Sequence, residues 1–236
     1  MISVKDVNYR YPKAKSNVLN DITMSFDQGK VNVIAGLNGA GKTTLFDLIT
    51  GVYPIQNGEF QNVPKMDDIL YQIQGTFLSQ MILGRDYARL VYKISGKKFQ
   101  KGSPSAFIDL GDQRENTLLE RLWNRELGQM SVGERRWLYV TLLSQLDRKM
   151  YLFDEPTSAI DPSSRLKICK RLERLAKEPG KTVIMSSHHL HELEFIACKL
   201  FVMNNGSVTF QGSYHEFLST FETTNPDIAF DHCINL

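Results

Sequence analysis

The chain has 236 residues, of which 42% are hydrophobic, and this length suffices for one large domain with or without a smaller lobe. Its 28 Lys and Arg residues nearly balance 26 Asp and Glu residues, so the charge gives no indication of binding to nucleic acid or lipid. Three widely spaced cysteines, Cys169, Cys198 and Cys233, fit neither a disulfide framework nor a paired-thiolate metal site, and they indicate a reducing cytosol.

The N-terminal part of the sequence predicts strands followed by a helix. Strands are expected at Ile2–Tyr11, which is rich in Val and Tyr, at the alternating segment Ile22–Phe26, and at the continuous apolar run Val31–Ala35. The segment Thr43–Ile49 has helical character and stops at Gly51. The residues between the third strand and this helix therefore form a glycine-rich turn.

The middle of the sequence, from about Ile82 to Gly128, changes to long amphipathic stretches. Asp86–Ile94 and Glu115–Leu127 have helical periodicity, and the polar segment Ser95–Ser105 separates them. We therefore expect a helical insertion in this part of the chain.

Strands and helices alternate after the insertion. The expected elements are a strand at Met150–Phe153, a helix at Ser163–Lys177, a strand at Thr182–Ser186, a helix at His189–Ala197 and a hairpin from Leu200 to Phe210 around Asn205-Gly206. Such alternation is typical of a mostly parallel sheet. No internal repeat is visible, and residues 213–236 carry no motif that indicates a structure.

No segment has the length and hydrophobicity of a membrane-spanning helix. Residues 1–15 contain no apolar stretch behind a basic start, and apolar residues nowhere run for the ~18 positions that a span needs. Any contact with a membrane is therefore expected to come through another protein.

A glycine-rich motif stands where the third predicted strand gives way to the first predicted helix. Its residues match GxxxxGK[ST] throughout: Gly36, Leu37, Asn38, Gly39, Ala40, Gly41, Lys42 and Thr43. Glycines let the backbone turn tightly enough to aim successive N–H groups at phosphate oxygens, with a helix N-terminus behind them. Lys42 is expected to bridge the β- and γ-phosphates, the Thr43 hydroxyl to bind Mg²⁺, and Thr44 to add a phosphate contact. The motif predicts a nucleoside triphosphate as the ligand.

Two carboxylates follow the strand predicted at Met150–Phe153. They lie at the end of a strand, where a parallel sheet opens toward its ligand. Asp154 is expected to hold Mg²⁺, directly or through water, and Glu155 to orient and polarise the attacking water. A solvated acidic pair is the alternative for this element taken alone, and the glycine-rich motif favours the catalytic interpretation.

The residues from Asp154 to Asp161, DEPTSAID, resemble the Walker B and D-loop segment of the ABC transporter nucleotide-binding domain. The resemblance covers residues 1–212 and implies an α/β fold of the P-loop NTPase, ABC ATPase type. Such a fold has a mostly parallel sheet core, an N-terminal antiparallel β lobe and an inserted helical subdomain. The chain is then one ABC ATPase domain, with a catalytic core at 1–80 and 135–212, a helical subdomain at about 82–134 and a C-terminal tail at 213–236. The resemblance also implies that Asp161 contributes to the nucleotide site.

Three further residues take their expected roles from the resemblance. His188, in SSHHLHEL, resembles the family's switch histidine, which contacts the γ-phosphate and the attacking water. Gln74 resembles the Q-loop glutamine, which senses Mg²⁺ and water and faces the membrane partner, while Gln72 and Gln80 remain alternatives. Tyr11 resembles the aromatic residue that stacks on adenine, although an ordinary core tyrosine is the alternative.

The segment Met130–Glu134, MSVGE, stands where the family's LSGGQ signature is found, and we call it the signature segment. In the family this segment is offered across a dimer, which implies that Ser131 and Gly133 bind the γ-phosphate held by a second subunit. Val132 replaces a glycine and Glu134 replaces the usual glutamine, which predicts weaker contacts than usual. Ser131 and Glu134 also form a capping-box pattern, and both interpretations can hold together.

The resemblance implies that the chain is the ATP-binding and ATP-hydrolysing subunit of an ABC transporter, with ATP and Mg²⁺ as cofactors. The implied partners are a second ATPase subunit, identical or different and arranged head to tail, and an integral-membrane permease on a separate chain, with no nucleic acid. The implied location is cytoplasmic, peripheral on the cytoplasmic face of the cell membrane.

Three other functions stay open from the sequence. A non-transport ABC-type ATPase acting on DNA or ribosomes would need long heptad segments or a second ATPase unit, and neither is present. A subunit that turns ATP over slowly as a regulatory partner is suggested by Val132 and Glu134, while Glu155 and His188 count against it. A P-loop kinase or GTPase would need an acceptor pocket or a guanine-reading segment, and the sequence shows neither.

Overall fold

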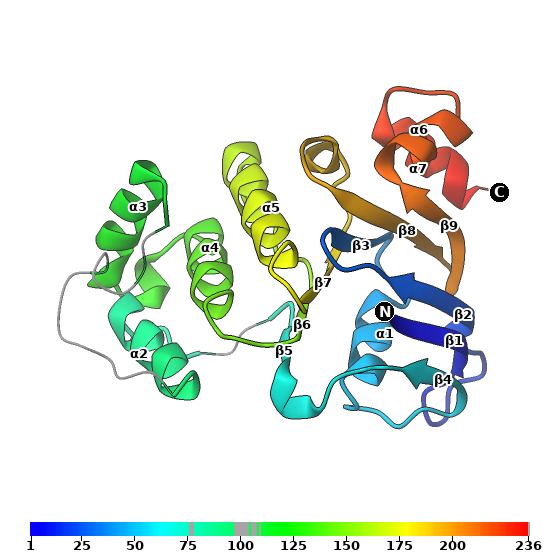
Figure 1. Cartoon of the computed structure of the whole chain (residues 1–236), viewed down its shortest axis with the longest axis horizontal. Coiled ribbons are helices and arrows are strands. Elements are labelled where there is room, and N and C mark those ends of the chain that lie inside the picture. Colours follow the sequence, from blue (N-terminus) through cyan, green and yellow to red (C-terminus); the bar gives the residue numbers. More distant parts are fainter. Residues whose placement is uncertain (76–77, 97–103, 105–107, 109, 236) are drawn as a thin grey trace. The chain divides into compact units, whose positions relative to one another are not determined.

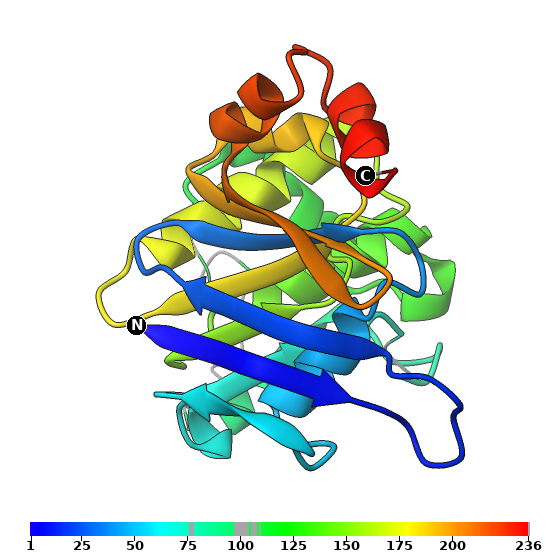
Figure 2. The same cartoon turned by 90° about the vertical axis from the view of Figure 1, so that its right-hand side faces the viewer.

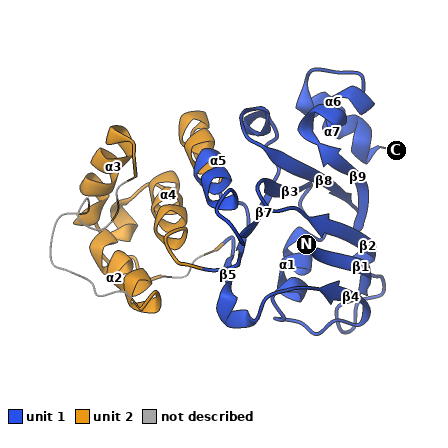
Figure 3. Ribbon diagram, in the orientation of Figure 1, with its two compact units in different colours: residues 1–74, 148–156, 169–236 blue, residues 75–147, 157–168 orange. Residues whose placement is uncertain are grey.

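The computed structural model describes residues 1–75, 78–96, 104, 108 and 110–235 (Figure 1). The chain divides into two compact units (Figure 3). The core unit comprises Met1–Gln74, Arg148–Pro156 and Cys169–Leu236, and the helical unit comprises Gly75–Asp147 and Thr157–Ile168. None of the helices in the described residues combines the length and the apolar character needed to cross a bilayer.

The core unit holds two sheets. The smaller sheet is antiparallel, with the strand order β2-β1-β4, and is formed by β1 (Ile2–Tyr9), β2 (Leu19–Phe26) and β4 (Asn57–Gln61). The larger sheet has the order β5-β6-β7-β3-β8-β9, and all its neighbouring pairs are parallel except β8 with β9. Its strands are β3 (Val31–Gly36), β5 (Ile69–Gln72), β6 (Met150–Phe153), β7 (Thr182–Ser187), β8 (Cys198–Asn204) and β9 (Ser207–Ser213). The predicted antiparallel N-terminal sheet and mostly parallel main sheet are both confirmed.

The strands at the centre of the larger sheet are buried along their whole length. Every residue of β3, β6 and β7 is buried, as expected for parallel strands covered on both faces. One hydrophobic cluster joins these strands to the smaller sheet through helix α1 (Lys42–Ile49), with Leu45 and Phe46 fully buried in it. This cluster fixes the start of α1 at the carboxyl end of β3, which is where the glycine-rich motif lies.

Two helices that the sequence interpretation did not predict follow β9 (Figure 2). Helix α6 (Tyr214–Thr220) contacts β8 and β9, and α7 (Pro226–Ile234) packs on the same hairpin. The side chain of Asn204 in β8 donates a hydrogen bond to the carbonyl oxygen of Ile234 at 2.7 Å. The C-terminal residues are therefore part of the core unit's packed structure.

The helical unit is built around α2 (Gly84–Ile94), α3 (Gln113–Trp123) and α4 (Val132–Leu143), which contact one another in all three pairs. Trp137 of α4 is buried, and the rings of Tyr87 and Tyr139 pack with centroids 4.8 Å apart. The helix α5 (Pro162–Ala176) begins in this unit and ends in the core unit.

Several predicted element boundaries differ from the structure. The prediction of a helix at His189–Ala197 is wrong, since only a 3-10 turn, η4 (His191–Phe195), forms there. The short connection that leaves β7 has to reach β8, which lies two positions away in the sheet. Helix α3 ends at Trp123, and two further 3-10 turns, η1 (Met66–Asp68) and η3 (Leu127–Gln129), were not predicted. Most of the polar segment Ser95–Ser105 lies outside the described residues.

Candidate nucleotide-binding site

The glycine-rich motif forms a loop between β3 and α1 at the rim of a cavity of about 550 Å³. Gly39 and Gly41 have φ angles of 85° and 100°, which favour glycine because a side chain is strained there. A Cβ atom on Gly41 would also lie 2.6 Å from Cδ2 of Leu19. The cavity is lined by Tyr11, Val18, Asn38, Gly39, Ala40, Gly41, Lys42, Thr43, Thr44, Gln74, Asp154 and Glu155.

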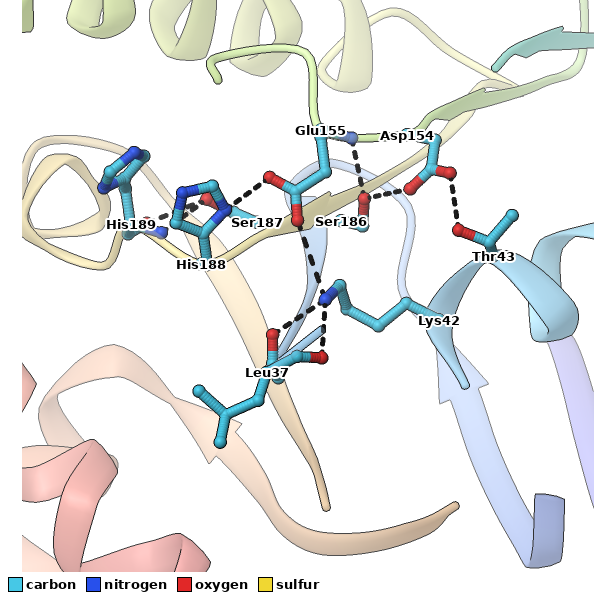
Figure 4. A network of polar contacts seen from close by, with 10 residues as sticks. Leu37, Lys42, Thr43, Asp154, Glu155, Ser186, Ser187, His188 and His189 are labelled. Carbon is cyan, nitrogen blue, oxygen red and sulfur yellow. Dashed lines mark hydrogen bonds and ion pairs between the residues drawn. The ribbon is translucent and has the colours of Figure 1, made fainter. Parts of the chain in front are cut away.

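The Lys42 ammonium is buried among oxygen atoms (Figure 4). Its Nζ donates hydrogen bonds to the carbonyl oxygens of Gly36, at 2.7 Å, and Leu37, at 3.1 Å, and lies 3.6 Å from Oε1 of Glu155. A buried ammonium is stable only with such acceptors around it. Phosphate oxygens offer the same acceptor chemistry with more negative charge, so this ammonium is suited to a triphosphate.

Asp154 is held at the end of β6 by two hydroxyl groups. The Thr43 hydroxyl donates to Oδ2 at 2.7 Å, and the Ser186 hydroxyl donates to Oδ1 at 2.6 Å. The end of the glycine-rich motif and the acid after β6 are therefore in direct contact. Ser186, which is fully buried at the end of β7, received no role from the sequence. The sequence feature that could have indicated it is a polar residue at the carboxyl end of a buried parallel strand.

Glu155 has a left-handed backbone, with φ at 53°, which is uncommon outside glycine and persists where the surroundings determine it. Its N–H donates to the Ser186 hydroxyl at 2.7 Å. Its Oε2 lies 2.6 Å from Nδ1 of His188, so the predicted base and the predicted switch histidine are in contact (Figure 4). The rings of His188 and His189 have centroids 4.1 Å apart.

Tyr11 also lines the cavity, and its ring packs with two other tyrosines. Its ring meets Tyr9 and Tyr53 edge to face, with centroids 5.2 and 5.5 Å apart. Its hydroxyl is 3.0 Å from Oγ1 of Thr44 on α1. The half-buried ring therefore has both a packed side and a place in the cavity wall, where an adenine could stack.

Asp47 ties α1 to the edge strand β5 beside this cavity. The Tyr71 hydroxyl donates to its Oδ1 at 3.1 Å. Burial raises the pKa of Asp47, and the neighbouring charge of Asp154 raises it further against the opposing effect of the Tyr71 hydrogen bond. Burial is also the main cause of the raised pKa of Tyr71.

The family model described as ABC transporter matches residues 19–158 of the sequence. The chain belongs to the ABC transporter family. The matched range holds the glycine-rich loop, the signature segment and both acids after β6, and as a member of this family the chain is an ATP-binding domain of the ABC ATPase type.

Known proteins agree with this membership. A putative ABC transporter ATP-binding protein of Treponema denticola is 30% identical over 88% of this chain, which spans 45% of that relative's length. An energy-coupling factor transporter ATP-binding protein of Mycoplasma mobile is 25% identical over 92% of this chain and 82% of the relative. A solved ATP-binding subunit of an ABC transporter has a TM-score of 0.76 at 21% identity and covers 99% of both chains. The predicted fold class is thereby confirmed.

The three candidate Q-loop glutamines of this ABC domain have different surroundings. Gln74 lines the cavity together with Asp154 and Glu155. Gln72 is buried in β5, where its backbone carbonyl oxygen accepts the N–H of Asp154 at 2.9 Å. Gln80 belongs to the helical unit, and its backbone carbonyl oxygen accepts the N–H of Gly128. Of these three glutamines, Gln74 is the one that lines the cavity.

The remaining predicted residues, Ser131, Gly133 and Asp161, lie in the helical unit. Ser131 caps α4 in the predicted capping box: its hydroxyl accepts the N–H of Glu134, and the Glu134 carboxylate accepts the N–H of Ser131. Asp161 accepts the N–H of Ser164 at 3.0 Å at the start of α5, and this bonding with Ser164 lowers the pKa of the Asp161 carboxyl. Ser131 and Asp161 therefore make local contacts at helix starts, besides the roles that the family suggests for them.

Proposed function

We propose that this chain binds Mg·ATP in the cavity beside α1 and hydrolyses it with Glu155 as the residue that orients and polarises water. The observation that carries the proposal is the convergence of four side chains at one end of the larger sheet. The Lys42 ammonium lies 3.6 Å from Glu155, and the Thr43 hydroxyl lies 2.7 Å from Asp154. These are the groups that phosphoryl transfer requires for charge neutralisation, metal binding and water activation.

The donor set fits magnesium. Thr43 and Asp154 supply a hydroxyl and a carboxylate oxygen, and Gln74, whose side-chain amide has an oxygen that can bind Mg²⁺, lines the same cavity. Among the described residues no group of three or more His, Cys, Asp or Glu side chains could hold a metal. Magnesium characteristically uses one or two protein oxygens together with substrate phosphates and water, so it suits this sparse site. When bound, Mg²⁺ would neutralise charge that develops on the phosphate oxygens.

Other residues of the chain bind the triphosphate, orient the attacking water and contact the adenine. Lys42 exchanges carbonyl and carboxylate partners for phosphate oxygens and stabilises their charge, while the amides of the glycine-rich loop position the triphosphate. Glu155, held by Ser186 and His188, accepts a hydrogen bond from the attacking water. Tyr11 supplies a face for adenine.

The proposed assembly is a head-to-tail dimer in which Ser131, Gly133 and Asp161 complete the nucleotide site of the second subunit. One solved relative of the same fold is a dimeric bacterial ABC transporter cassette, with a TM-score of 0.69 at 21% identity. Closure of two subunits around ATP and reopening after hydrolysis would drive a separate permease through the Gln74 region. Curated relatives are named as ATP-binding proteins of energy-coupling factor transporters, which supports a place at the cytoplasmic face of the membrane.

Replacing Glu155 by Gln tests the proposal. The amide keeps the size of the side chain but cannot accept a proton, so we expect phosphate release from Mg·ATP to fall about 10² to 10⁴-fold. Nucleotide should still bind, and a stable dimer should form in Mg·ATP and be absent without it, as measured by analytical ultracentrifugation. Undiminished hydrolysis by this variant would remove Glu155 from its proposed role.

Two controls separate binding from chemistry. Lys42→Ala should lose nucleotide binding itself, because the loop amides alone leave the phosphate charge without its ammonium partner. Chelating the metal with EDTA should stop hydrolysis by the parent protein. Tight Mg·ATP binding by Lys42→Ala would contradict the assignment of the cavity.

A further inference from the structure

The first turn of α4 carries an acidic residue where the usual signature has a neutral one. Glu134 replaces the glutamine of the usual signature, and it is the third residue of α4. Its Oε2 accepts the Ser131 N–H at 2.8 Å in the capping box. An acid at this position stabilises an isolated helix, since it interacts favourably with the positive N-terminal end.

The negative charge of Glu134 opposes the proposed binding of a γ-phosphate at the N-terminal end of α4. A γ-phosphate brought to Ser131 and Gly133 by a second subunit would meet the positive end of α4 and, within the same turn, the Glu134 carboxylate. Like charges near one helix N-terminus cancel much of its attraction for an anion. An acidic signature segment therefore needs a compensating positive charge that leaves the helix end open.

Two arginines supply this charge from the end of α3 and the turn after it. Arg121 Nη2 lies 2.8 Å from Oε1 of Glu134, and Arg125 Nη1 lies 3.5 Å from the same oxygen. Both contact the oxygen that the capping box does not use. The Glu134 side chain is 18% exposed, while Arg121 is 61% exposed, so the neutralising charge stands on the solvent side.

We propose that Arg121 and Arg125 are positioning residues for the signature segment, which hold the Glu134 carboxylate in the cap and neutralise it so that α4 still binds the partner's nucleotide. The proposal rests on the head-to-tail dimer of the proposed function. Ser131 and Val132 are exposed at this end, which leaves them accessible to a second subunit. The positive charges of the two arginines thus offset the negative charge of Glu134, which a glutamine at this position would not carry.

The test measures Mg·ATP-dependent dimerisation in the Glu155→Gln background by analytical ultracentrifugation. Arg121→Ala combined with Arg125→Ala should raise the dimer dissociation constant about tenfold, because the carboxylate charge is then uncompensated. Nucleotide affinity of the monomer, measured with ADP by titration calorimetry, should stay unchanged, since the core unit is untouched. Arg121→Lys with Arg125→Lys keeps the charge and should dimerise nearly as well as the parent.

The decisive measurement is rescue. Glu134→Gln keeps the capping hydrogen bond without the charge, so adding it to the double alanine variant should restore dimerisation. A merely structural role of the arginines in joining α3 to α4 would leave the triple variant impaired. The matched control is Arg89→Ala, which removes an arginine of the same unit that pairs with Asp86 at 2.9 Å, and which should not change the dimer.

The outcomes separate this inference from the function on which it rests. A parent protein in the Glu155→Gln background that never dimerises in Mg·ATP overturns the proposed dimer and this inference with it. A parent that dimerises, together with a double alanine variant that dimerises equally or is not rescued by Glu134→Gln, overturns the role of the arginines alone.

Discussion

The hydroxyl of Ser186 joins the two acids on which the proposed chemistry depends. It donates to Asp154 and accepts the N–H of Glu155, and it is fully buried. We predict that Ser186→Ala lowers kcat more than it changes KM, because Glu155 loses the contact that holds its left-handed backbone. The unpaired buried groups should also cost about 1–3 kcal/mol of unfolding free energy.

Activity and thermal unfolding of two further variants complete this prediction. Ser186→Thr keeps a hydroxyl and should recover part of kcat. Ser144→Ala removes a hydroxyl that donates to the Thr141 carbonyl at 2.9 Å in the helical unit, and it should lower stability without a selective fall in kcat. Equal kcat for Ser186→Ala and the parent would show that Glu155 needs no such support.

At the scale of single elements, two glycines of the glycine-rich loop differ in how much space an added side chain would find. Gly39 and Gly41 both have positive φ angles, but a Cβ on Gly39 meets nothing within 4 Å, whereas one on Gly41 meets Leu19 at 2.6 Å. We predict that Gly39→Ala costs about 1–3 kcal/mol of stability through backbone strain. Gly41→Ala should cost more and should also shift α1 and weaken nucleotide binding.

Denaturant unfolding and ADP titration of the two variants side by side check this difference. Both glycines have positive φ angles, so a larger effect at Gly41 reports the crowding of the added Cβ against Leu19 and the Val18 carbonyl oxygen. Equal losses for both variants would mean that packing behind the loop does not set the position of α1.

The elements that the sequence predicted best are those with a strong local pattern. The apolar run Val31–Ala35 and the glycines after it specify a strand, a turn and a helix together, and the structure has all three. Helices α6 and α7 also have local sequence signals, namely a capping box at Ser213 and an Asn-Pro start at residue 225. The sequence analysis predicted no structure for residues 213–236 despite these signals.

Other features depend on tertiary contacts and leave little trace in the sequence. Helical periodicity at His189–Ala197 was overridden because the chain has to reach β8, and the bridging role of Ser186 exists only because β6 and β7 are neighbours. Likewise, the pairing of Arg121 with Glu134 depends on how α3 packs on α4. Long-range partners of this kind follow from packing rather than from spacing.

At the scale of the whole molecule, nucleotide binding and unfolding are linked. A ligand that binds the folded chain alone adds RT ln(1 + [L]/Kd) to its stability, about 2.7 kcal/mol at one hundred times Kd. For a chain of this length, about 1 kcal/mol shifts the melting temperature by roughly 2–4 °C. Saturating Mg·ADP should therefore raise the melting temperature of the parent by about 5–10 °C, measured by scanning calorimetry at fixed protein concentration.

The location of the binding groups makes this prediction specific. All residues that line the cavity belong to the core unit, so the added stability should appear in the transition that unfolds the core unit, and a separate transition of the helical unit should stay in place. Lys42→Ala should abolish the shift. Lys149→Ala, which removes a surface lysine paired with Asp68 at 2.8 Å, changes the net charge equally and should retain it. A shift of equal size in Lys42→Ala would place the nucleotide elsewhere on the molecule, because the buried ammonium would then contribute nothing to its binding.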